Sequence, residues 1–284
     1  MAVDLHTHSC CSDGSLTPSE LMELAYEKKL SAIALTDHDT VSGIKEAKKA
    51  AEDLSITLIP GIEISSLYDL GNVVKEFHIL GLGVDETDVQ FLKKLEQYGA
   101  LRQERNEKML RLISENVCNI DKDEFYARFD RSVITRAHFA QYLYEKGIVS
   151  SVKEAFDRYL GDGKPCYIPK EGVTAKEAIT CIREAGGHPV LAHLLAHPPQ
   201  YRLSLTVLDK VIKDLKACGL EGIEVVYSTY TNAQERELRT LAVKNELHMT
   251  GGSDYHGTPK PDIQLGTGLG NLYVPDALAN WLLA

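Results

Sequence analysis

Histidines and acidic residues gather in short polar segments along this chain, and their side chains are the ones best suited to chemistry. Examples are D-L-H-T-H-S at 4–9, T-D-H-D at 36–39 and G-G-S-D-Y-H-G at 251–257. Imidazole nitrogens and carboxylate oxygens together suit zinc, manganese or iron. The sequence therefore predicts a cluster of two or three divalent metal ions. The candidate ligands are His6, His8, Asp13, His38, Glu63, His78, His193, Asp254 and His256.

Nearly all of these residues lie at or just past the end of a short apolar segment. Strands are predicted at 2–6, 31–36, 56–60, 73–83, 188–192, 222–227 and 247–250. Helices are predicted at 18–29, 43–53, 174–185, 205–217 and 232–245, with a closing helix at 276–284. Alternating strands and helices predict a parallel sheet. About seven such units favour an α/β fold built as a closed or nearly closed barrel, whose strand ends converge on one face.

The alternation stops between the fourth and fifth strands. Residues 87–116 are predicted as one long charged helix, and 120–160 carry further helical patterns without a clear strand. We therefore assign 1–96 and 171–284 to the barrel domain. Residues 97–170 are then a helical insertion in one barrel loop, placed to cover the active site.

The composition limits the partners. The 284 residues carry a formal net charge of -10, which argues against binding to duplex nucleic acid, because that needs a basic face. A short nucleotide remains possible, since bound metals reverse the local charge. The six cysteines form no C-x-x-C pair, and we find neither a signal peptide nor an apolar run of about 20 residues. We expect a cytoplasmic protein with reduced thiols and no membrane contact.

Each candidate has a plainer explanation when it is taken alone. An H-x-H pair is often surface decoration, Glu63 fits a salt bridge, and His78 fits a packed or exposed histidine. The coincidence of all of them with strand ends favours the metal site. His188 and His248 lie in predicted strands, and we interpret both as structural.

Two neighbourhoods leave the ligand set open. The segment L-A-H-L-L-A-H-P offers both His193 and His197, and His193 is preferred because it directly follows a strand. Cys10 and Cys11 adjoin the site, and thiolates bind zinc. Adjacent cysteines in a loop are more often bystanders, so both are left out of the predicted set.

The polar segments resemble those of the PHP family, named for polymerase and histidinol phosphatase. D-L-H-T-H-S, T-D-H-D, G-I-E-I-S, F-H-I-L-G, V-L-A-H and G-G-S-D-Y-H-G occur in the order of that family. The resemblance implies a distorted seven-stranded β/α barrel of the PHP type with up to three metals. The ligand sets that it implies are His6, His8, Glu63 and Asp254 for one metal, Asp13, His38 and His256 for a second, and Glu63, His78 and His193 for a third. Asp13 stands where some relatives carry histidine, and its harder oxygen favours manganese or iron.

The predicted insertion carries a second resemblance. R-A-H-F-A at 136–140 and Y-L-G-D-G-K-P-C-Y-I at 159–168 are similar to a branch that acts on nucleotides. That branch includes nucleoside 3',5'-bisphosphate phosphatases and 5'-3' exoribonucleases on short RNA. By this resemblance, Arg136, His138 and Lys164 hold substrate phosphate or ribose. Arg102 and Arg105, on the long charged helix, are weaker candidates because such helix faces are usually solvated.

The expected activity is hydrolysis of a phosphate monoester of a small nucleotide by metal-activated hydroxide. Glu63 would hold the metals at their spacing, and Asp37 or His193 would shuttle protons. The alternatives are a 5'-3' exoribonuclease on short RNA, a phosphatase for histidinol phosphate and a metal-binding module without activity. A C–N hydrolase on a related barrel is a further alternative, but no lysine follows a strand here as those barrels commonly require.

Overall fold

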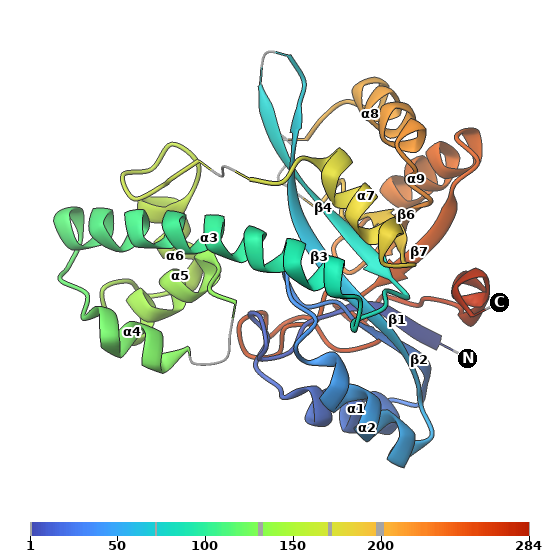
Figure 1. Ribbon diagram of the computed structural model, residues 1–284, viewed down its shortest axis with the longest axis horizontal. Coiled ribbons are helices and arrows are strands. Elements are labelled where there is room, and N and C mark those ends of the chain that lie inside the picture. The colour runs from blue at the N-terminus through green and yellow to red at the C-terminus, as the bar shows by residue number, and fades with distance from the viewer. Residues whose placement is uncertain (1, 72, 130–132, 170–171, 197–201, 284) are drawn as a thin grey trace.

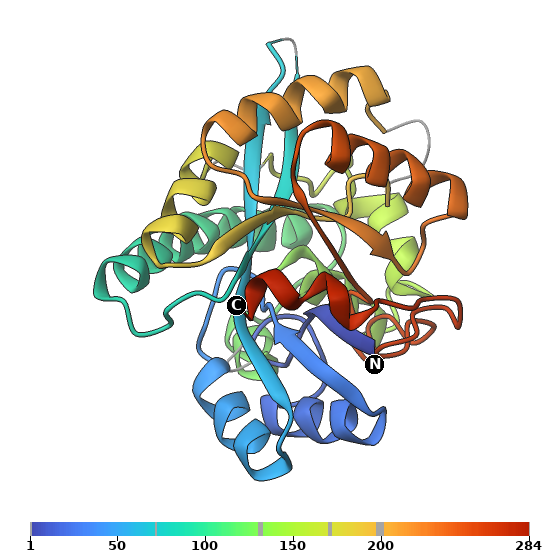
Figure 2. The ribbon, with the colours of Figure 1, turned by 90° about the vertical axis from the view of Figure 1, so that its right-hand side faces the viewer.

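Seven strands form one sheet in chain order. We describe the protein from a computed structural model, which covers residues 2–71, 73–129, 133–169, 172–196 and 202–283. The strands are β1 (Ala2–Thr7), β2 (Leu30–Leu35), β3 (Thr57–Asp69), β4 (Val74–Leu82), β5 (His188–Leu191), β6 (Gly222–Tyr227) and β7 (His248–Gly252). Figures 1 and 2 show the sheet curling around a central axis with helices outside it.

The first and last strands come together and nearly close the sheet. Thr7 pairs with Tyr255 just past β7. The N–H of Asp254 donates to the carbonyl of His6 at 2.9 Å, and the N–H of His8 donates to Tyr255 at 2.9 Å. The predicted α/β fold with a distorted, nearly closed seven-stranded barrel is therefore confirmed.

The prediction of an all-parallel sheet is wrong for β4. This strand is antiparallel to both β3 and β5. Only a short turn joins β3 to β4, whereas a parallel pair needs a crossover connection of about a dozen residues. β3 also continues to Asp69 rather than ending at Pro60, so Glu63 lies within a strand and not after one.

Within the described ranges, five helices shorter than α3 (Val89–Asn116) pack around the barrel. They are α1 (Pro18–Glu27), α2 (Ile44–Leu54), α7 (Ala175–Glu184), α8 (Leu205–Ala217) and α9 (Asn232–Lys244). α1 and α2 lie together on one side, and α7, α8 and α9 lie on the other (Figure 1). Thr17, Thr174 and Thr231 each form a capping box at the start of α1, α7 and α9, which satisfies otherwise unpaired N–H groups there.

The long helix α3 (Val89–Asn116) links the barrel to a smaller group of helices. These are α4 (Lys122–Arg128), α5 (Arg136–Glu145) and α6 (Val152–Ala155), followed by a π-helical turn at Phe156–Leu160. Phe91 and Leu95 of α3 belong to the barrel core, whereas Met109 and Ile113 belong to a second apolar cluster among the smaller helices. α3 runs unbroken through residue 97, and the domain boundary there stays a prediction.

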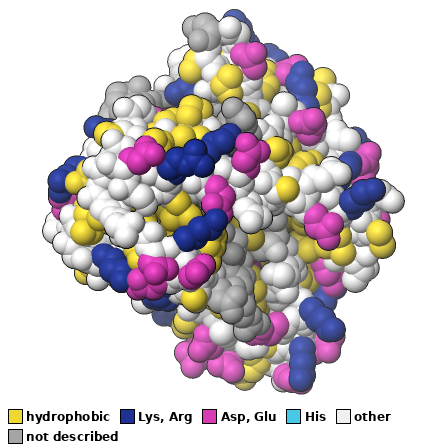
Figure 3. Space-filling model, turned by 60° about the vertical axis from the view of Figure 1, so that its left-hand side comes forward, with side chains coloured by type: hydrophobic (Ala, Val, Ile, Leu, Met, Phe, Trp, Pro, Cys, Tyr) yellow, Lys and Arg dark blue, Asp and Glu magenta, His cyan; other side chains and the backbone are white. Residues whose placement is uncertain are grey.

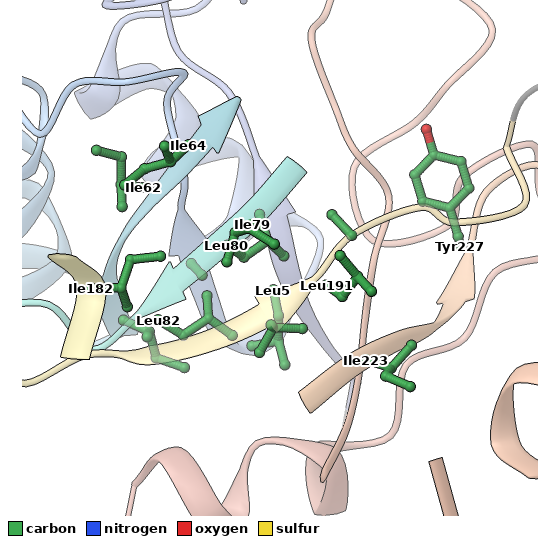
Figure 4. Close-up of a cluster of buried hydrophobic side chains, with 14 of the residues drawn as sticks. Leu5, Ile62, Ile64, Ile79, Leu80, Leu82, Ile182, Leu191, Ile223 and Tyr227 are labelled. Carbon is green, nitrogen blue, oxygen red and sulfur yellow. The ribbon is translucent and has the colours of Figure 1, made fainter. Parts of the chain in front are cut away.

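The barrel core is built mainly from strand residues. Figure 4 shows apolar side chains from β1, β3, β4, β5, β6 and α7 gathered in one cluster. Gly81 of β4 permits this close packing, because a Cβ there would lie 2.9 Å from Ile182 of α7 and 3.0 Å from Ile62 of β3. Packing of these apolar side chains fixes the positions of the strands relative to one another, and with them the polar residues at the strand ends.

The C-terminus corrects another prediction. Residues 276–284 were expected as one helix, but the described part forms two short 3₁₀ segments, Asp276–Leu278 and Asn280–Leu282. Trp281 stacks on the His248 ring at a centroid distance of 4.2 Å and meets His188 edge-on at 5.1 Å. The contacts of this indole, together with the pairing of Pro275 with Ala2, hold the segment against the barrel. A regular helix this short has little stability of its own.

None of the helices in the described ranges is long and apolar enough to cross a membrane. Figure 3 shows one face of the molecule, on which basic and acidic side chains are interspersed.

Candidate metal centre

The structure brings all nine predicted metal ligands together at one end of the barrel. Within the described residues they fall into four groups whose donor atoms lie within 4.8 Å of one another. The groups are His8, Asp13, His38 and His256; His6, Glu63 and His193; His6, His8 and Asp254; and His38, Glu63 and His78. The sharing of His6, His8, His38 and Glu63 between groups indicates one continuous cluster.

Glu63 lies at the centre of this cluster. Its Oε2 is 3.3 Å from His6 Nε2, 3.2 Å from His8 Nε2 and 3.1 Å from His38 Nδ1. Its Oε1 is 2.7 Å from His78 Nδ1 and 2.8 Å from His193 Nε2. One carboxylate thus faces five imidazoles, which suits the bridging role that the PHP resemblance implies for it.

Asp13 and Asp254 lie at the edges of the cluster. Asp13 Oδ1 is 3.2 Å from His256 Nε2, and Asp13 Oδ2 is 3.7 Å from His38 Nε2. Asp254 Oδ1 is 3.3 Å from His8 Nε2. His8 therefore joins the group of Asp13 and His256 as well as that of Asp254, which differs from the sets that the resemblance implies.

The donor set fits divalent metal ions. His6 Nε2, His8 Nε2, His38 Nδ1, Asp13 Oδ1 and Glu63 Oε2 are buried and make no hydrogen bond among the described residues. Buried polar atoms nearly always have a hydrogen-bond partner, so five such atoms in one place fit the coordination of metal ions. Burial by itself would raise the pKa of Glu63, but His38, His78 and His6 hold it well below its usual range. The carboxylate is therefore ready to act as an anionic ligand.

Three supporting residues were missed by the sequence analysis. Glu224, fully buried in β6, contacts His6 Nδ1 at 2.9 Å. The hydroxyl of Tyr227 donates to Asp254 Oδ2 at 2.6 Å, and Lys260 Nζ donates to the same oxygen at 2.7 Å. The signal for Glu224 was present, because it is the single acid in the apolar strand G-I-E-V-V-Y.

Asp37, predicted as a proton shuttle, is hydrogen-bonded within the loop that follows β1. Its carboxylate accepts hydrogen bonds from the N–H of Ser9 at 2.8 Å, Ser9 Oγ at 2.6 Å and Ser12 Oγ at 2.6 Å. It belongs to none of the four groups and does not line the cavity described next. These contacts hold the loop between His8 and Asp13, and a catalytic role of Asp37 stays a prediction.

A cavity of about 780 Å³ opens beside the cluster. Asp13, His38, His78 and His193 line one part of it. Its basic lining residues are Lys75, Arg102, Arg105, Arg136, Lys164 and Arg202. Two residues predicted to bind substrate, Arg136 and Lys164, therefore lie at the same cavity as the predicted metal ligands.

The guanidinium of Arg136 joins the barrel to the helical part. It is 3.2 Å from Asp162 Oδ1 and 3.5 Å from Glu76 Oε2 of β4. It also lies 5.4 Å from the centre of the Tyr167 ring. Arg102, on α3, pairs with the Asp39 carboxylate beside His38. The helical residues thus contact the barrel next to the candidate metal centre.

His138 is placed differently from its prediction. It is buried outside the cavity lining, and its Nδ1 accepts the N–H of Thr135 at 3.0 Å. Its ring packs edge-on against Phe129 at 4.6 Å, and burial lowers its pKa. These contacts make His138 part of the cap of α5, and a role in substrate binding stays a prediction.

Two further open points concern His197 and the cysteine pair. His197 lies outside the described residues. Neither Cys10 nor Cys11 is a member of the four donor groups. His193, in contrast, faces Glu63 directly.

A model of the PHP domain matches residues 4–173 of this sequence. The chain belongs to the PHP domain family. One PHP relative, a 5'-3' exoribonuclease of Haemophilus influenzae, is 37% identical over 266 residues, which cover 94% of this chain and 93% of the relative. A 3',5'-nucleoside bisphosphate phosphatase of Chromobacterium violaceum is 32% identical over 255 residues, which cover 89% and 87% of the two chains.

A solved structure supports the same family assignment. A protein from Bifidobacterium adolescentis, described as a metal-dependent phosphoesterase, superposes with a TM-score of 0.87 at 30% identity. The match covers 99% of this PHP chain and 95% of the other. The predicted family is confirmed, and with it the prediction of a metal-dependent phosphoesterase at the level of the family.

Proposed function

We propose that this PHP protein hydrolyses the 3'-phosphate of a nucleoside 3',5'-bisphosphate or a similar phosphate monoester of a small nucleotide. The observation that carries the proposal is the single carboxylate of Glu63 facing five imidazoles beside a cavity lined by basic side chains. The bisphosphatase of Chromobacterium violaceum, 32% identical, supports this substrate class.

Two or three divalent ions are the proposed cofactor. His6, His8, Asp13, His38, Glu63, His78, His193, Asp254 and His256 would hold them. Such ions neutralise charge on phosphoryl oxygens and lower the pKa of water. Manganese, zinc or iron suits this mixed set of imidazole and carboxylate donors, and the oxygen donor of Asp13 shifts the preference toward manganese or iron.

The basic residues of the cavity would bind the part of the substrate that does not react. The planar guanidinium of Arg136 suits two phosphate oxygens at once, and Lys164 adds a point charge. Arg136 is already held between Glu76 and Asp162, so its orientation is set before a ligand arrives. Glu63 and His193 stay as the proposed catalytic residues, with Glu63 spacing the donors and His193 facing both Glu63 and the cavity.

A second candidate is 5'-3' exoribonuclease activity on short RNA. The 37% identity to the exoribonuclease of Haemophilus influenzae favours it. The cavity of about 780 Å³ reaches from His193 to Lys164 on the helical part, which leaves room for more than the reacting phosphate. The acidic net charge of -10 supports small or single-stranded partners over duplex nucleic acid. None of the six cysteines forms a disulfide in the described structure, which supports a reducing, cytoplasmic setting.

The test is phosphate release by the manganese-loaded protein. The substrates are adenosine 3',5'-bisphosphate, AMP, histidinol phosphate and a short 5'-phosphorylated RNA, with His38→Ala as background. Selective release from the bisphosphate, lost in His38→Ala, is the expected result. Stepwise release of mononucleotides from the RNA would transfer the proposal to the exoribonuclease. Bound metal without turnover of any substrate would refute both.

A further inference from the structure

Glu224 is a buried carboxylate in the middle of an apolar strand. It is the third residue of β6, its side chain is 0% exposed, and its chain neighbours Ile223 and Val225 are equally buried. Acidic side chains are almost never fully buried unless they are paired. Its partners therefore indicate what the residue does.

One carboxylate oxygen of Glu224 faces the ring of His6. Glu224 Oε1 is 2.9 Å from His6 Nδ1. A carboxylate accepts only, so Nδ1 carries the proton and Nε2 is the nitrogen left to bind a metal. That Nε2 is buried without a hydrogen bond among the described residues, 3.3 Å from Glu63 and 3.6 Å from Asp254.

The second oxygen of Glu224 holds the backbone of His193. The N–H of His193 donates to Glu224 Oε2 at 2.7 Å. His193 has a φ of 33°, in the region that residues other than glycine rarely adopt. This turn directs its imidazole back to Glu63, with Nε2 at 2.8 Å from Oε1. Strained backbone persists only where its surroundings hold it, and Glu224 supplies such a contact.

We propose that Glu224 is the positioning residue of this centre, because it fixes the tautomer of His6 and the backbone turn of His193 at the same time. Both histidines belong to one donor group, with Glu63 between them. The inference rests on the proposed metal-dependent function. Second-layer carboxylates of this kind orient the ligand ring and raise its basicity.

Glu224→Gln is the decisive variant. It keeps size and shape, but glutamine has one acceptor oxygen and one NH₂ group, whereas the site presents two donors, His6 Nδ1 and the His193 N–H. One donor must then face the NH₂ group. We expect zinc to bind about 10- to 100-fold more weakly than to wild type.

Asp4→Asn is the matched control. Asp4 of β1 is also 0% exposed, but it accepts from the backbone N–H groups of Ser253 at 2.8 Å, Gly266 at 2.9 Å and His6 at 3.4 Å. It touches no imidazole ring in the described structure. We expect Asp4→Asn to lower the unfolding temperature while leaving zinc affinity close to that of wild type.

The experiment titrates zinc into the full chain against a competing chelator and records ¹⁵N spectra of the zinc-loaded histidines. In wild type, His6 should show a protonated Nδ1 and a metal-bound Nε2. In Glu224→Gln this pattern should be lost together with affinity, and Glu224→Asp, which keeps the charge but reaches less far, should lie between.

Two outcomes would overturn the inference. One is unchanged zinc affinity and an unchanged His6 spectrum in Glu224→Gln. The other is an equal loss of affinity in Asp4→Asn, which would show a general effect on folding. Failure of wild type itself to bind metal would instead refute the proposed function, so the two failures are distinguishable.

Discussion

At the scale of single residues, the carboxylate of Glu63 has an unusual number of imidazole neighbours. It is 1% exposed and lies within 3.3 Å of five imidazole nitrogens. In a buried site, electrostatic interactions are stronger than in water, and an unpaired charge is costly. Removing this one side chain therefore affects every donor group that contains it.

Glu63→Ala should lose metal and activity together. We expect activity at saturating manganese to fall at least about 100-fold, since loss of a supporting residue alone costs 10- to 100-fold. Metal content by elemental analysis checks the first effect and phosphate release the second. The control is Glu221→Ala. Glu221 forms a similar pair with His188, in which Oε2 is 2.6 Å from Nδ1, but neither residue belongs to the four donor groups. A fully active Glu63→Ala protein would contradict the model.

Without metal, the histidines of the cluster differ in their protonation: burial lowers the pKa of His38 and His256, whereas acidic neighbours raise the pKa of His8 and His78. Burial alone would lower the pKa of His8, but Asp254 and Glu63 raise it to about 9. Burial would likewise lower the pKa of His78, but Glu63 and Glu76 raise it to about 9. Only the neutral ring binds a metal, so protons and metal compete for these nitrogens at neutral pH.

Metal affinity should therefore rise with pH. The pKa of His8 and of His78 is raised to about 9, so both rings are protonated below that pH. Each ring must release its proton before it binds a metal ion, so a higher pH favours binding. Calorimetric titration in buffers of different ionisation enthalpy counts the protons released. We expect release at about pH 7 and almost none at about pH 10. Proton release that is the same at both would contradict the assignment of these rings as ligands.

At the scale of elements, the hairpin of β3 and β4 explains how Glu63 reaches His78. The two strands pair antiparallel, with Glu63 opposite Leu80 and Ser65 opposite His78. Residues opposite and diagonal to each other on one face of such a pair lie within reach. Glu63 and His78 are diagonal neighbours on one face, which gives their contact of 2.7 Å.

The helical part contributes to the site through the start of α5. Arg136 is the first residue of this helix, and Thr135 caps it with help from His138. The Thr135 hydroxyl also donates to Asp13 Oδ2 at 3.2 Å. The cap therefore fixes the position of Arg136 relative to a candidate metal ligand, although His138 itself stays out of the cavity.

Arg136→Ala should weaken substrate binding. A hydrogen bond to a charged group contributes about 1.5–3 kcal/mol, so we expect KM for the nucleotide to rise about 10- to 100-fold with kcat less affected. Steady-state kinetics measure both. The matched control is Arg158→Ala, because Arg158 lies on the same helical part and pairs with Glu154 outside the cavity lining. An equal rise of KM in both variants would argue against a specific role for Arg136.

At the scale of the whole molecule, the site depends on the closing of the barrel. His6 and His8 come from β1 and its end, whereas Asp254 and His256 follow β7. Gly252 makes this seam possible, because a Cβ there would lie 2.4 Å from His6 Cβ and 2.5 Å from its backbone nitrogen. Two ends of the chain are thus brought to one cluster.

Gly252→Ala should open this seam. We expect the free energy of unfolding to fall by about 1–3 kcal/mol, as for overpacked sites, with weaker metal binding. The same substitution at Gly99 of α3, where a Cβ meets nothing within 4 Å, should stabilise the protein by about 0.5–1 kcal/mol through helix propensity. Denaturant unfolding with and without metal checks both. Equal effects at the two positions would contradict this account of the seam.

The sequence by itself predicted the barrel and the nine residues that the structure brings together, and their role as metal ligands stays a prediction. The type of each residue shows whether it can bind a metal, and the ends of strands can be predicted locally from apolar runs and turn residues. The contacts of Asp37 and His138 could not be predicted from the sequence, because a carboxylate or an imidazole looks the same in a sequence whether it faces a cavity or caps a loop. Only the partners Ser9, Ser12 and Thr135 distinguish these roles.

The tertiary structure decided the direction of β4, the grouping of the donors and the placement of Glu224. These depend on contacts between residues far apart in the chain, such as the 2.9 Å contact of His6 with Glu224 across 218 positions. Local patterns hold no information on such distances. Strand pairing sets which side chains share a face, and barrel closure sets which chain ends meet. Residue type therefore determined what chemistry is available, and packing determined which atoms perform it.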